Sequence, residues 1–105
     1  MAFLELKNIE ITEPVAGFRA RVVNTAGMTV AHWEIDAGAV MPEHHHPSEQ
    51  VVNLIEGEFE LTVGAETRKM VAGSLAVIDP DVPHSGKALT ACRIVDAFHP
   101  PRSYD

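Results

Sequence analysis

The chain has 105 residues, of which 46% are hydrophobic and 22% charged, so it is long enough for one globular domain and too short for two. Its formal net charge of −7 disfavours a nucleic-acid partner or an anionic membrane surface, because both recruit basic protein surfaces.

Short candidate strands separated by turn residues follow one another along the chain. We expect strands at residues 18–23, 28–35, 40–46, 50–56, 58–63, 67–71, 75–78 and 91–98. In 58–63, Phe59, Leu61 and Val63 alternate with polar residues, which is the period of a half-buried strand. Many short strands and no long helical pattern predict an all-β sandwich or barrel, arranged as a single domain over residues 1–105.

Three consecutive histidines stand out in the segment 43–50. In an extended strand, His44 and His46 point to the same side and His45 to the opposite side. A turn at 47–48 then brings Gln50, at the start of the next strand, beside the histidine pair. Two imidazoles and one carboxamide oxygen therefore form three converging metal ligands.

A fourth ligand is expected from a distant segment, and His84, after a proline-rich corner, is the best candidate. Glu49 is the alternative to Gln50, although strand alternation points it away. Neutral ligands of this kind suit one divalent ion, such as Ni, Fe, Mn, Zn or Co, and leave its full charge. The histidines that we do not expect to bind the ion are His32, His45 and His99.

These residues resemble the two motifs of the cupin superfamily, over about residues 38–57 and 73–88. The first motif consists of Gly38, His44, His46, Gln50 and Gly57, and the second runs from Gly73 to His84 and on to Ala88. Family members usually have Gly where Asp81 stands, and Asp can adopt the same left-handed turn conformation at some cost. The resemblance implies the cupin double-stranded β-helix, a jelly-roll barrel.

A narrower resemblance involves the tail, residues 96–102, which is similar to that of small cupins acting on unsaturated uronates in pectin breakdown. These proteins open a 4,5-unsaturated galacturonate to its linear keto form. The resemblance implies that Asp96, Phe98 and Arg102 line the site. Asp96 would then move a proton, Arg102 would grip the carboxylate of an anionic, sugar-derived substrate, and Phe98 would contact it.

The last candidate strand places Cys92, Ile94, Asp96 and Phe98 on one face. If that face lines the barrel, Asp96 is a carboxylate among apolar residues near a metal. The sole cysteine, Cys92, cannot form an internal disulfide and is expected to be a buried thiol.

Two other functions remain open from these residues. A metal-dependent dioxygenase would use open metal positions for oxygen, and a non-catalytic cupin would bind a small ligand or use the metal only for stability. Residues 1–10 carry charges in place of an apolar signal segment, so we expect a cytoplasmic protein without a membrane span. Exposed edge strands predict a homodimer.

Overall fold

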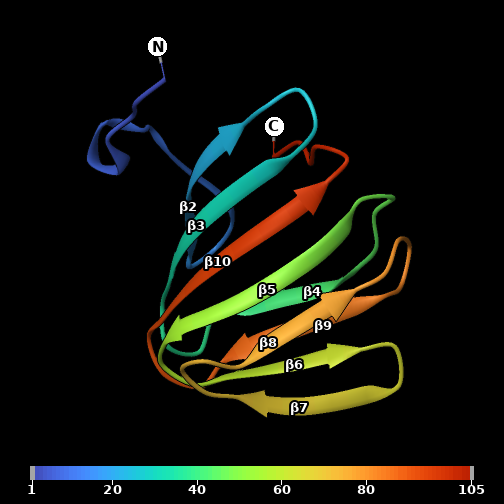
Figure 1. The fold of residues 1–105 in the computed structure, drawn as a ribbon. Helices are drawn as coiled ribbons and strands as arrows, with labels where there is room; N and C mark the ends of the chain where they lie inside the picture. The colour runs from blue at the N-terminus through green and yellow to red at the C-terminus, as the bar shows by residue number, and fades with distance from the viewer. Residues whose placement is uncertain (1, 105) are drawn as a thin grey trace.

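The computed structural model describes residues 2–104, which form ten strands and one short 3-10 turn at Leu6–Asn8. Figure 1 shows the strands arranged as two facing layers, with the N-terminal segment projecting from one end. The strands are β1 (Ile11–Val15), β2 (Phe18–Asn24), β3 (Thr29–Ile35), β4 (Val40–His44), β5 (Glu49–Glu56), β6 (Phe59–Val63), β7 (Glu66–Met70), β8 (Leu75–Ile78), β9 (His84–Ala88) and β10 (Cys92–His99).

The larger sheet has the order β1-β2-β3-β10-β5-β8 and the smaller has the order β4-β9-β6-β7. Strand β10, the last in the chain, lies between β3 and β5 (Figure 1). The strand pairs in both sheets are antiparallel. This two-sheet architecture confirms the predicted all-β jelly roll. Within residues 2–104, no helix has the length and apolar character needed to cross a bilayer.

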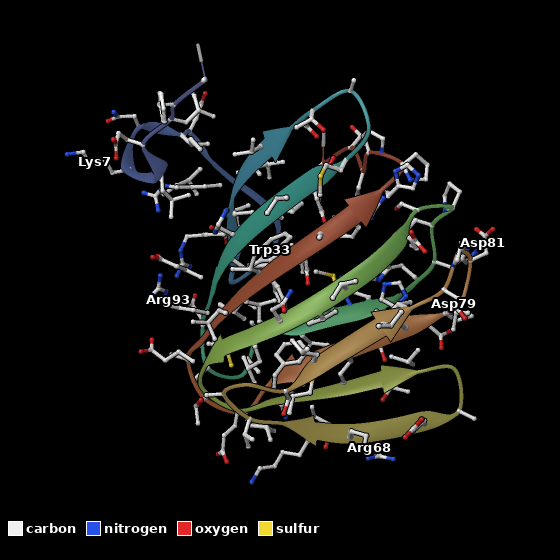
Figure 2. The ribbon with its side chains drawn as sticks, viewed as in Figure 1. Lys7, Trp33, Arg68, Asp79, Asp81 and Arg93 are labelled. Carbon is white, nitrogen blue, oxygen red and sulfur yellow. The ribbon has the colours of Figure 1, made fainter. Side chains whose placement is uncertain are left out.

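Strand alternation places the core between the two sheets. The inward face of β10 carries Cys92, Ile94, Asp96 and Phe98, all buried, as the sequence predicted. Figure 2 shows the side chain of Arg93, the residue after Cys92, pointing away from the barrel. Burial raises the pKa of the Cys92 thiol, which therefore behaves as a small core residue.

Two strands were missing from the sequence prediction. Strand β1 has strand-forming Ile11, Thr12 and Val15 but also Pro14, which removes a backbone donor, and β9 contains Gly86 and few residues typical of strands. The expected strand 40–46 is also too long, because β4 ends at His44. Strand β1 forms by pairing with β2, and β9 forms by pairing with β4 and β6.

The corner before β9 confirms the conformation expected for Asp81. Its φ is 63°, the left-handed region that Gly usually occupies. The Asp81 N–H donates to the His46 carbonyl oxygen at 2.8 Å, which ties this corner to the histidine segment. Figure 2 shows Asp79 and Asp81 together at this edge of the barrel.

We expect Gly57→Ala to destabilise the protein by roughly 2–4 kcal/mol. Gly57 has φ +97°, and a Cβ atom would lie 2.3 Å from the Ala91 carbonyl oxygen and 2.8 Å from Cys92 Sγ. Urea unfolding would measure the change. Gly27→Ala is the matched control, because no atom lies within 4 Å of a Cβ at Gly27. Equal stabilities of the two variants would contradict the expected clash.

Candidate functional site

Three histidines from two distant segments of the chain converge inside one end of the barrel. His44 ends β4, His46 follows two residues later, and His84 begins β9, where it pairs with His44 across the ladder. One ligating nitrogen from each histidine lies within 4.8 Å of those of the other two. His46 and His84 are buried and His44 is half-buried. The structure thus brings together the three histidines that the sequence proposed as ligands.

The hydrogen bonds of these rings leave their other nitrogens free to bind an ion. In each ring, Nδ1 lies 2.8 Å from a backbone carbonyl oxygen two residues away: that of Pro42 for His44, of Ser48 for His46 and of Val82 for His84. A carbonyl only accepts, so Nδ1 carries the proton and the Nε2 lone pair is free. His84 Nε2 is buried without a hydrogen-bond partner among residues 2–104. These residues fit a metal ion.

Burial also keeps two of the rings neutral. It lowers the pKa of His46, and it lowers the pKa of His84 to about 4, because the charged imidazolium is disfavoured away from water. A neutral imidazole is the form that binds a metal ion. Both rings are therefore in their metal-binding form near pH 7.

Gln50 lies beside the histidines, whereas Glu49 is exposed on the other face of β5. Gln50 Oε1 is 3.2 Å from His46 Nε2. With the His46 proton on Nδ1, neither of these atoms donates to the other, so both present lone pairs to the same space. This placement favours Gln50 over Glu49 as the fourth ligand.

The remaining histidines lie outside this cluster. His45 is exposed, and its Nδ1 lies 3.7 Å from an Asp81 carboxylate oxygen. His99 Nδ1 bonds the Gly27 carbonyl oxygen at 2.6 Å, and the side chain of His32 is on the outer face of β3.

A cavity of about 470 Å³ lies between the sheets, and its lining includes His44, Gln50, His84, Asp96 and Arg102. Five of the residues predicted for the site therefore face one space. The lining contains neither His46 nor Phe98, the other two residues predicted for the site. Phe98 is 2% exposed, and its ring packs against that of His46 with centroids 5.6 Å apart. The Phe98 ring therefore packs against His46 and does not face the cavity.

Asp96 is a carboxylate in a nearly dry environment. Burial raises its pKa to about 7, while the Gln50 amide and the Trp33 indole N–H lower it in part. Its Oδ1 atom is buried and has no hydrogen-bond partner at standard geometry among the described residues. Arg102, from the tail, is half-buried, and its Nε is likewise unpartnered there. The cavity thus holds an acid–base group and a cation within one lining.

Four aromatic residues that were not predicted for the site line the cavity, and two of them, Trp33 and Tyr104, contact each other. Trp33 projects inward from β3, and Tyr104 reaches it because the tail folds back after β10. The two rings meet edge to face with centroids 5.3 Å apart. The backbone N–H of Arg102 donates to Thr29 Oγ1 at 2.9 Å and holds this tail in place. Trp33 was detectable as an inward position of its strand, whereas nothing in the tail sequence signalled Tyr104.

Known proteins include relatives of this chain by sequence. An uncharacterized protein of Streptomyces coelicolor is 29% identical over 77 residues, which are 72% of this chain and 73% of that protein. The HTH-type transcriptional regulator PuuR of Escherichia coli is 35% identical over 57 residues, 52% of this chain and 31% of PuuR, so the match spans about a third of that regulator.

Solved structures match almost the whole fold. An RmlC-like cupin from Shewanella frigidimarina has a TM-score of 0.91 at 25% identity, with 98% of this chain and 94% of that chain covered. KdgF from a Halomonas species has a TM-score of 0.89 at 23% identity, with 96% of both chains covered. The family model described as "Cupin domain" matches residues 31–98. This chain therefore belongs to the cupin family.

Proposed function

We propose that this cupin is a metal-dependent enzyme that opens a 4,5-unsaturated uronate, or a similar small sugar acid, to its linear keto form. One observation carries the proposal: the buried Asp96 lines the same cavity as His84, whose ring has a nitrogen without a hydrogen-bond partner among the described residues. A proton-transfer group and a metal site in one cavity suit acid–base catalysis. The resemblance of residues 96–102 to uronate-acting cupins supports the choice of substrate.

His44, His46, His84 and Gln50 would hold one divalent ion, with Ni, Fe, Mn, Zn and Co all compatible with this donor set. When bound, the ion supplies a positive charge that polarises substrate oxygens. Because all four donors are neutral, they do not reduce that charge.

The remaining groups bind the substrate and move its proton. Arg102 binds the substrate carboxylate. Asp96 accepts the proton of the hemiacetal hydroxyl as the ring carbon–oxygen bond breaks, which yields an aldehyde and an enolate. It then returns that proton to the enolate carbon, which gives the ketone. Atoms balance, because the product is an isomer of the substrate.

Incubation of the metal-loaded protein with 4,5-unsaturated galacturonate tests this function. We expect the enol-ether ultraviolet absorbance to disappear faster than in buffer, a chelator to abolish the effect, and added metal to restore it. Absence of acceleration by fully loaded protein would rule the activity out. Oxygen consumption during the assay would instead support the dioxygenase.

A ligand-binding role without turnover is the second candidate, and the partial match to the regulator PuuR favours it. Binding of the uronate without any loss of absorbance would indicate this role.

The homodimer stays a prediction. Strand β8 is at a sheet edge, and its Leu75 and Val77 side chains are each 67% exposed.

A further inference from the structure

The cavity changes from polar to apolar along the smaller sheet. At one end, His84 on β9 pairs with Val63 on β6. Two residues further along the ladder, Leu61 pairs with Gly86, and Phe59 follows in the next inward position. Gly86 leaves room for the Phe59 ring, because a Cβ there would lie 2.3 Å from Phe59 Cε2. The inward positions of this sheet beyond His84 are thus apolar, and polar Ser85, next to His84, is also part of the lining.

The larger sheet changes in the same direction. On β5, Gln50 is followed by Val52 on the inward face, and on β10 Asp96 is preceded by Ile94. Strand β10 runs antiparallel to β5, and Val52 pairs directly with Asp96. Asp96 thus lies level with Val52, one inward position beyond Gln50, and the next inward position, where Ile94 pairs with Leu54, is apolar in both strands.

Six side chains make up this apolar wall, and all are at most 8% exposed. They are Phe18, Ile35, Val52, Phe59, Leu61 and Ile94, and all line the cavity. The polar atoms beside this wall include Trp33 Nε1 and Asp96 Oδ1. A ligand hydroxyl facing the hydrocarbon side chains would lose its water and gain no partner from them, which costs binding free energy.

We propose that the ligand of this cavity is a small ring carboxylic acid with an apolar body, whose carboxylate lies at the Arg102 end and whose body packs on the apolar wall. The role of Arg102 rests on the proposed function. A cavity of about 470 Å³ has the usual size of a small-molecule site. An unsaturated uronate has no hydroxyl on its double bond, so it offers one apolar edge that a saturated uronate lacks.

Two inert acids of similar ring size test the proposal: cyclohexanecarboxylate and saturated galacturonate. Trp33 is the only tryptophan of the chain and lines the cavity, so its fluorescence reports binding to metal-loaded protein, with titration calorimetry as a second measurement. We expect cyclohexanecarboxylate to bind at least about tenfold more tightly. Equal affinities, tighter galacturonate, or binding of neither acid would overturn the proposal.

Paired substitutions on β10 locate the preference. Ile94→Thr adds a hydroxyl to the apolar wall and should weaken cyclohexanecarboxylate binding about fivefold or more, without weakening galacturonate binding. Val95→Thr adds a hydroxyl one residue along, on the outer face, and should change neither affinity. Circular dichroism measures whether both variants fold. If Ile94→Thr does not fold, the comparison of the two acids on wild-type protein still tests the proposal. Neither probe is turned over, so failure of the uronate assay leaves this result intact.

Discussion

Asp96→Asn should lower turnover of the unsaturated uronate by about 10²–10⁴-fold, the range that general acid–base groups contribute. Asparagine has nearly the same shape as aspartate but cannot accept and return a proton at pH 7. Metal content should stay unchanged, because Asp96 is not among the expected ligands. Initial rates at saturating substrate, with metal measured on the same sample, test the expectation. Turnover within about threefold of wild type, with metal retained, would remove Asp96 from the mechanism.

A stability measurement separates this loss of activity from misfolding. The pKa of Asp96 is raised from 3.8 to about 7 by burial, so the folded protein binds more protons than the unfolded chain between these pH values. The contribution of Asp96 to the stability of metal-free protein therefore falls as pH rises through that window, whereas His84, whose pKa is lowered to about 4, contributes in the opposite direction below pH 6.5. The cost at pH 8 is on the order of 4 kcal/mol at most.

Asp96→Asn removes the cost of burying this charge. Metal-free Asp96→Asn protein should therefore be more stable than metal-free wild type in urea at pH 8, and the two should be similar at pH 4. Inactive protein that is also more stable has kept its fold and lost the proton-transfer group. A variant that is less stable than wild type at pH 8 would contradict the assigned environment of Asp96.

His84→Ala should weaken divalent-metal binding by more than about 100-fold, since even residues that only orient metal ligands contribute 10–100-fold. His84 supplies a buried ring nitrogen that has no other partner among the described residues. Calorimetric titration with Ni²⁺ at pH 7.5 measures the change. Added Ni²⁺ should also raise the melting temperature of wild type and leave that of the variant unchanged.

His45→Ala is the matched control for this substitution. His45 lies between two expected ligands in the sequence, yet its side chain is exposed and outside the cluster. Its loss should change Ni²⁺ affinity less than twofold, a difference of about 0.4 kcal/mol. Equal losses in His45→Ala and His84→Ala would show that Ni²⁺ binds exposed imidazoles in place of the buried cluster.

The sequence by itself determined those features that depend on local geometry. Side-chain alternation in a strand predicted that His44 and His46 share one face and that Gln50, not Glu49, turns inward. The same period placed Cys92, Ile94, Asp96 and Phe98 on one face of the last strand. The resemblance of the segments around His44 and His84 to the two cupin motifs was enough to predict the family.

Only the tertiary structure decided which residues from distant segments share the cavity. Phe98 was expected to contact substrate, but it packs beneath His46, since a strand period indicates an inward face and not what covers it. Tyr104 meets Trp33 because the tail bonds Thr29, 73 residues from Arg102 in the chain. Likewise, β9 owes its extended form to ladders with β4 and β6, because its own residues have little strand preference. Contacts of this range depend on the packing of whole sheets, which no local pattern records.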